Sequence, residues 1–131
     1  MVASRLTCEP TIAGPGFGPV SAAGESLAIR EWTDSGPSYL HIHRSDDEAW
    51  HVLEGTLRFR FEHGEIDAPA GTTVFVPAGL AHTYRVMGPS RYLIVLTPRL
   101  DRLIARLRSL TDQSQLRSTL AEFATEMVDM V

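Results

Sequence analysis

The segment HIHRSDDEAWHVLEG, residues 41–55, concentrates side chains that could bind a metal ion. His41 and His43 stand two positions apart, and Glu48 follows His43 by five positions. Alternate residues of a β-strand lie on one face, so both histidines are expected to point to the same side. If the chain reverses over residues 44–47, Glu48 begins the next strand opposite the two imidazoles. These three side chains could then share one ligand.

A further histidine closes the segment GTTVFVPAGLAH, residues 71–82. Gly71 predicts a turn into a strand, and Pro77 with Gly79 predicts a tight turn before His82. Three imidazoles and one carboxylate could therefore converge inside a barrel. Imidazole suits Zn, Cu, Fe and Ni, whereas a carboxylate suits harder ions such as Mn. Without a metal, burial of Glu48 among apolar strands would raise its pKa and destabilise the fold.

Each of these residues taken alone has a simpler interpretation, because a single strand histidine is more often at the surface or hydrogen-bonded in the core. The joint pattern, with its matching Gly and Pro turns, favours a metal site. His51 has the wrong strand parity and His63 lies in a turn, so neither is expected to be a ligand. Tyr39, Trp50 and Tyr84 have the parity to face the same cavity, where they would either contact a substrate or simply fill the barrel.

Residues 25–98 show the pattern of an antiparallel β-protein. Short runs rich in Val, Ile, Phe, Tyr and Thr alternate with Gly and Pro, and TLRFRFE alternates apolar and charged residues. Hairpin turns are predicted at residues 54–55 and 63–64. No helical pattern interrupts these runs, so residues 25–98 are predicted to form an all-β sandwich or barrel.

Two segments flank the predicted barrel. Residues 1–24 contain AGPGFGPV, whose glycine spacing and prolines do not fit a nucleotide-binding loop, and they are predicted to form an irregular arm. Residues 99–131 change to a helical period, and Thr111 or Ser114 could cap a second helix. The apolar face of that second helix would contain Leu116, Leu120, Phe123 and Met127, with Met130 or Val131 after them. These apolar faces would pack on the barrel, form a subunit interface or cover a pocket.

Length, charge and composition exclude several classes of protein. The chain has 131 residues and a formal net charge of −4, which fits one domain and gives no sign of a nucleic-acid-binding surface. It contains no lysine, so a lysine Schiff base and a P-loop lysine are excluded. Cys8 is the only cysteine, which excludes an intrachain disulfide. No apolar run approaches the length of a membrane helix and no apolar leader is seen, so a cytoplasmic protein is expected.

The two histidine segments resemble the two motifs of the cupin superfamily. The first motif corresponds to Gly36, His41, His43, Glu48 and Gly55, and the second to Gly71, Pro77, Gly79 and His82. Both motifs are present in order and together cover residues 36–86. Two positions depart from the pattern. The gap between Gly36 and His41 is one residue shorter than usual, and Val86 stands where an asparagine often closes the second motif.

The resemblance implies an all-β double-stranded β-helix, or jelly-roll barrel, with a C-terminal helical extension. It also implies that His41, His43, Glu48 and His82 are the ligands of a divalent metal ion, with Fe, Mn or Ni favoured and Zn as an alternative. Residues 24–55, together with LTPRLDRLIARL after the barrel, are similar to small single-domain cupins related to quercetin dioxygenases.

Three functions remain open at this point. The favoured one is a dioxygenase-like oxidoreductase acting on a small organic substrate, such as an aromatic enol, with Glu48 as both ligand and catalytic proton acceptor. The second is a metal-assisted isomerase or lyase, in which Arg85 or Arg91 could hold a phosphate. The third is a non-catalytic sensor or small-ligand-binding protein. A homodimer is expected because sheet edges need covering and cupins often pair through N-terminal strands.

Overall fold

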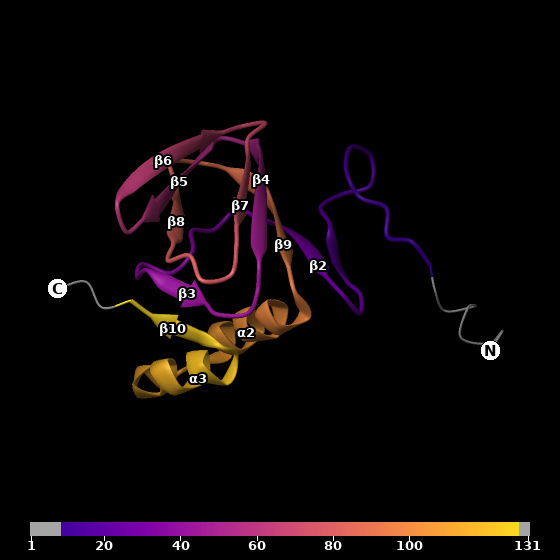
Figure 1. Cartoon of the computed structure of the whole chain (residues 1–131). Helices are drawn as coiled ribbons and strands as arrows, with labels where there is room; N and C mark the ends of the chain where they lie inside the picture. The colour runs from indigo at the N-terminus through magenta and orange to yellow at the C-terminus, as the bar shows by residue number, and fades with distance from the viewer. Residues whose placement is uncertain (1–8, 129–131) are drawn as a thin grey trace.

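The computed structural model describes residues 9–128 and shows two β-sheets that face each other as a barrel (Figure 1). The larger sheet has the strand order β1, β2, β9, β4, β7, and the smaller one has the order β6, β5, β8. The larger sheet consists of β1 Ser21–Ala23, β2 Ala28–Trp32, β9 Arg91–Leu96, β4 Glu48–Glu54 and β7 Thr73–Val76. The smaller sheet consists of β6 Gly64–Pro69, β5 Thr56–Phe61 and β8 Thr83–Val86, while β3 His41–His43 pairs with β10 Thr125–Met127. The predicted all-β jelly-roll with a helical C-terminal part is confirmed.

The alternation of residue types decides which face of each strand is buried. In β5, Leu57 and Phe59 are fully buried, whereas Arg58 and Arg60 lie on the outer face. The other core strands contribute Trp50, Val52, Ala68, Val76, Tyr84, Tyr92, Ile94 and Leu96 to the same cluster. Removing these side chains from water is the main favourable contribution to the stability of the barrel.

Three features of the sheets differ from the sequence-based expectations. Strands β4 and β5 belong to different sheets, so the predicted turn at residues 54–55 is a crossing between sheets and not a hairpin. Strand β6 was not predicted, because its sequence GEIDAP is largely polar and only Ala68 is buried. It forms a true hairpin with β5, in which Phe61 lies opposite Gly64. Strand β1 pairs with β2 and extends the sheet into the segment predicted as an irregular arm.

The segment after β9 is only partly helical. Helix α2 spans Pro98–Ser109, with Thr97 as N-cap and proline in the first turn, as such a sequence favours. A 3₁₀ turn, η1 Gln113–Gln115, is capped by Asp112 and not by either residue predicted, and α3 follows over Leu116–Glu122. The chain then reverses at Ala124, which has a positive φ of 53°, and enters β10.

Met127 was therefore wrongly predicted to lie on a helix. It lies in β10, where it pairs with His41 of β3. Met130 and Val131, which were predicted to follow on that helix, lie outside the described residues.

Helices α2 and α3 cover the end of the barrel at which β3 and β10 lie (Figure 1). Leu100 and Leu103 of α2 and Leu120 of α3 are buried in the same apolar cluster as Trp50. The helices are thus part of the folded core and not an appendage. Within residues 9–128, no helix is long and apolar enough to span a lipid bilayer.

We expect Gly55→Ala to lower the free energy of unfolding by about 2 kcal/mol or more. Gly55 has a φ of +75°, and a Cβ at this position would collide with the carbonyl oxygen of Pro89 and with Ser90. Urea denaturation measures the change. The matched control is Gly64→Ala at the start of β6, because a Cβ there meets nothing within 4 Å. Equal effects of the two substitutions would contradict the prediction.

Candidate metal centre

Four ionisable side chains meet inside the barrel. His41 and His43 come from β3, Glu48 is the first residue of β4, and His82 directly precedes β8. All four are buried, and one potential ligand atom from each lies within 4.8 Å of the others. The sequence-based expectation that these residues converge is therefore met in space.

Backbone hydrogen bonds bring the two sequence segments together. The amide of His41 donates to the carbonyl of His82 at 3.1 Å, and the amide of His82 donates to the carbonyl of His41 at 3.0 Å. The amide of Gly79, a residue with a φ of +92°, donates to the carbonyl of His43 at 2.8 Å. The side chain of Asp47 accepts from the amide of Ala78 at 2.9 Å. The glycine turn of the second segment is thereby attached to the strand and turn of the first.

Each histidine of the cluster is held in place by a hydrogen bond at its Nδ1 atom. The Nδ1 of His82 lies 2.9 Å from the carbonyl oxygen of Leu80, and that of His41 lies 3.4 Å from the carbonyl oxygen of Tyr39. Because carbonyl oxygens only accept hydrogen bonds, these contacts place the proton on Nδ1. The Nε2 atoms are then free to act as ligands.

Thr125 holds His43 in the same way. Its Oγ1 lies 2.8 Å from the Nδ1 of His43 and donates its own proton to the carbonyl oxygen of Phe123 at 3.1 Å. The hydroxyl must therefore accept from Nδ1, which leaves the Nε2 of His43 without a proton. Such outer hydrogen bonds fix the orientation and tautomer of metal-binding histidines.

The carboxylate of Glu48 faces two of these nitrogens. Its Oε1 lies 3.0 Å from the Nε2 of His82 and 3.2 Å from the Nε2 of His43. A carboxylate and an unprotonated imidazole both accept hydrogen bonds, so at these distances they need a shared cation, either a proton or a metal ion. Three neutral nitrogens and one anionic oxygen in a buried space fit a divalent ion.

The pKa values of the cluster depend on burial and on its internal hydrogen bonds. Burial opposes ionisation of Glu48. When a shared proton lets the Nε2 atoms of His43 and His82 donate to the carboxylate, these hydrogen bonds outweigh burial and lower the pKa of Glu48 to about 2. Burial does act to raise the pKa of Glu48, as expected, but the neighbouring imidazoles more than compensate, so the pKa is lowered overall. Burial, assisted by repulsion from His82 and His43, lowers the pKa of His41 to about 3. At neutral pH Glu48 is thus anionic and His41 is neutral, which are the forms that bind metal ions.

A cavity of about 370 Å³ opens from the cluster towards the C-terminal helices. His41, His43 and Glu48 line its floor, while His82 lies behind them with 1% of its surface exposed. Leucines of α2 and α3 form much of its wall: Leu100, Leu103, Leu107, Leu116 and Leu120. A buried donor set therefore borders a mostly apolar cavity, as is common in small-molecule sites.

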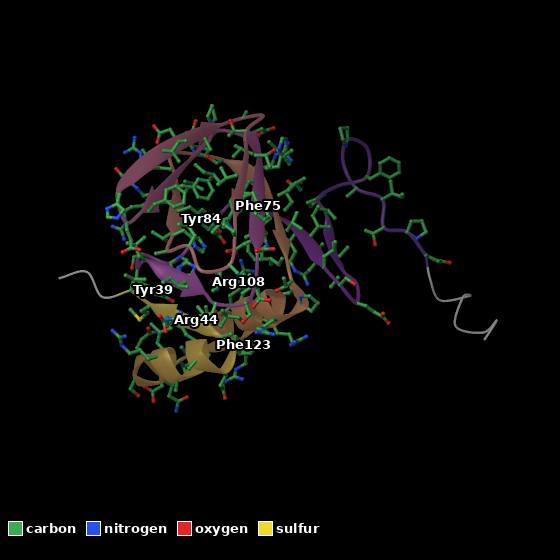
Figure 2. All side chains as sticks on the ribbon, in the orientation of Figure 1. Tyr39, Arg44, Phe75, Tyr84, Arg108 and Phe123 are labelled. Atoms are coloured by element: carbon green, nitrogen blue, oxygen red, sulfur yellow. The ribbon has the colours of Figure 1, made fainter. Side chains whose placement is uncertain are left out.

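The three aromatic residues predicted to face the cavity all line it. Trp50 and Tyr84 are also buried core residues, and Figure 2 shows Tyr84 inside the barrel. The hydroxyl of Tyr84 lies 2.7 Å from that of Tyr92, which donates to the carbonyl of Asp34 at 2.5 Å. Tyr39 is only partly buried and stands beside His41, with ring centroids 5.9 Å apart. Trp50 and Tyr84 thus fill the barrel and border the cavity at once.

The other two histidines of the barrel region lie outside the cluster, as expected. His51 points away from it and contacts the Oγ1 of Thr73 through Nδ1 at 2.7 Å, and His63 is exposed in the turn between β5 and β6. Thr125 was missed, because residues near it follow an apolar pattern that predicts helix and nothing nearby links it to His43. Only the pairing of β10 with β3 brings the two residues together.

Comparison with known proteins identifies the class of this chain. Residues 23–96 match the cupin domain, which is more than half of the 131 residues. The chain therefore belongs to the cupin family. No curated protein matches its sequence.

Solved structures share the fold. A cupin-2 domain containing protein from Shewanella frigidimarina is 21% identical, with 72% of this chain and 90% of that chain covered and a TM-score of 0.53. KdgF from a Halomonas species is 19% identical, with 71% and 90% covered and a TM-score of 0.54. PAC13 from Streptomyces, determined with uridine, is 13% identical, with 59% and 63% covered and a TM-score of 0.50. At these identities the likeness concerns the fold and not the reaction.

The metal-free protein should lose stability as the pH falls below the ordinary pKa of histidine, 6.5. His41 takes up a proton near 6.5 when unfolded but only near 3 when folded, so the unfolded state binds more protons between these values. We expect the titration of His41 to lower the free energy of unfolding by about 2 kcal/mol between about pH 6.5 and pH 4.5. The substitution His41→Gln should abolish this contribution to the pH dependence. Urea denaturation at the two pH values measures it, with His51→Gln as control. An unchanged pH dependence in His41→Gln would contradict the assignment.

Loss of the Thr125 hydroxyl should weaken metal binding. Thr125→Val keeps the shape and the strand pairing but releases the Nδ1 of His43, so we expect Co(II) affinity to fall by about 10-fold to 100-fold. Competition with a chromophoric chelator measures this affinity. The control is Thr73→Val, which removes the same kind of hydroxyl–imidazole contact at His51. A folded Thr125→Val protein with wild-type affinity would rule out this role.

Proposed function

We propose that this cupin is a metal-dependent oxidoreductase of the dioxygenase kind, acting on a small organic substrate with an enol or aromatic group. The observation that carries the proposal is the buried set of three histidines and one glutamate at the floor of a mostly apolar cavity. Iron, manganese or nickel suits this donor set, and zinc would also bind it. The sequence resemblance of residues 24–55 to small cupins related to quercetin dioxygenases favours the same class.

His41, His43, Glu48 and His82 would hold the ion in this proposal. When bound, the ion supplies Lewis acidity and redox exchange with dioxygen. The leucines of α2 and α3 would limit the access of water to the bound substrate, and Tyr39 and Trp50 would present flat surfaces to a planar substrate. Glu48 is the one carboxylate in the cluster and is ionised at neutral pH, so it is also our candidate for accepting the hydroxyl proton of the substrate. Its low pKa makes it a weak base, which favours ligation as its main task.

The alternative of a phosphate-binding isomerase has less support. Arg91 is paired with Glu31 and Glu54 at 2.8 and 3.0 Å. Arg85 lies on the outer side of β8 near Arg58 and does not line the cavity of the cluster. Neither arginine is therefore placed to hold a substrate phosphate beside the candidate ligands. A non-catalytic binding protein would use the same cavity, and only a measurement of turnover separates it from an enzyme.

A homodimer remains our proposal for the assembly. On the outer face of the larger sheet, Ile29 lies opposite Val95, Val95 opposite Ala49, and Ala49 opposite Phe75. Phe75 is 61% exposed. An apolar row across four paired strands supports association, because covering such a surface with a second copy lowers the free energy of the assembly.

The purified chain, without an affinity tag or a chelator, should contain about one divalent ion and should consume dioxygen with a flavonol or another enol. Elemental analysis and an oxygen electrode measure the two properties. Replacement of His43 and His82 together by alanine should abolish both, whereas His51→Ala should retain both. A folded wild type that cannot be loaded with any of these ions would overturn the site. A loaded protein that leaves dioxygen untouched with every enol tested would overturn the reaction class.

A further inference from the structure

A single arginine stands where the cavity meets the C-terminal helices. Arg108, in the last turn of α2, lines the same cavity as His41 and Glu48, and Figure 2 shows it between the barrel and α2. Among the described residues that line this cavity, it is the one cation. The cavity therefore has the candidate metal ligands at its floor and a positive charge elsewhere on its wall.

Unlike Arg99 and Arg106 of the same helix, Arg108 has no carboxylate partner among the described residues. Arg106 pairs with Glu122 at 3.3 Å, and Arg99 lies 3.6 Å from Asp46. Asp34 lines the same cavity, but no ion pair joins it to Arg108. The guanidinium is thus available to a ligand.

An aromatic ring holds the guanidinium in place. The Cζ atom of Arg108 lies over the ring of Trp32, 4.4 Å from its centroid. A guanidinium that stacks on an aromatic face keeps the N–H groups at its edge free for a carboxylate, which a paired arginine does not. Trp32 also lines the cavity, so this pair forms part of its wall.

The positive charge of Arg108 affects the pKa values of tyrosines inside the barrel. Burial raises the pKa of Tyr84 to about 12, and the positive charge of Arg108 acts against this rise. The charge of Arg108 also acts to lower the pKa of Tyr92, which burial raises. An anion in the cavity would therefore be attracted to Arg108, which lines the cavity and is also exposed to solvent.

We propose that Arg108 is a specificity-determining residue that binds a carboxylate of the ligand, so that the ligand is a small organic acid with an apolar body. This inference rests on the proposed function in one respect: it assumes that the other end of the acid lies at the candidate metal ligands. Recognition of the carboxylate itself needs only Arg108 and Trp32. A charge-assisted hydrogen bond to a stacked guanidinium gives both affinity and orientation.

The test compares acids with their uncharged amides. The probes are 3-phenylpropanoate and 3-phenylpropanamide, and then 3-(3,4-dihydroxyphenyl)propanoate and its amide, whose catechol group can bind a metal ion. Calorimetry measures their affinities for the wild type, for Arg108→Gln and for Arg102→Gln, with the proteins both metal-free and loaded with Co(II). Arg102 is exposed on the same helix and does not line the cavity, which makes it the matched control.

We expect the wild type and Arg102→Gln to prefer each acid over its amide by about tenfold. Arg108→Gln should lose this preference while its affinity for the amides, its melting temperature and its metal content stay unchanged. A preference that persists in Arg108→Gln, or the absence of any preference or binding in the wild type at millimolar probe concentration, would overturn the inference.

The two proposals fail in different ways. If the chain binds no metal, or turns over no enol, the proposed function fails, but the acid-over-amide preference of the metal-free protein still tests Arg108 with the simple phenylpropanoate pair. If Co(II) binds and enols react while Arg108→Gln discriminates as the wild type does, the function stands and the role of Arg108 does not.

Discussion

The interaction on which the rest of the site depends is the contact between the buried carboxylate of Glu48 and the imidazoles of His43 and His82. An isolated carboxylate at this depth would oppose folding, because its charge would lose the stabilisation that water provides. The fold must therefore place both imidazoles beside the same oxygen atom of the Glu48 carboxylate. Each imidazole must also be held in place by a hydrogen bond at its Nδ1 atom. Strand parity, the backbone bridge between His41 and His82 and the glycine turn at Gly79 all serve that requirement.

The segment after the barrel serves the site in two ways. Leucines of α2 and α3 complete the apolar core and at the same time form the wall of the cavity. Strand β10 places the Thr125 hydroxyl behind His43. Packing and function are therefore not separable here, since a change that loosens these helices would also alter the cavity and the orientation of a candidate ligand. The candidate ligands are placed by the strands and turns of the barrel, and their surroundings are built by the packing of the C-terminal segment.

This division explains what could be predicted from the sequence. The spacing of His41, His43 and Glu48 specifies one face of adjoining strands, so their convergence follows from the period of two and one reversal. His82 follows from its turn and from the cupin resemblance. Thr125 and Arg108 could not be found in this way, because strand β10 and the position of α2 depend on contacts made by residues far apart in the chain. Strand β6 was missed for a related reason: its polar residues form a strand only because β5 supplies the hydrogen-bonding partner.

The contact between His43 and Thr125 can form only late in the synthesis of the chain. These residues lie 82 positions apart, so the ribosome has completed the whole barrel before Thr125 is synthesised. Until then His43 lacks the hydroxyl that binds its Nδ1. A chain that has not yet formed β10 consequently lacks one of the contacts that orient the candidate ligands, whereas the finished chain has it. The orientation of this candidate ligand is thereby completed only when the last strand of the described chain has paired with β3.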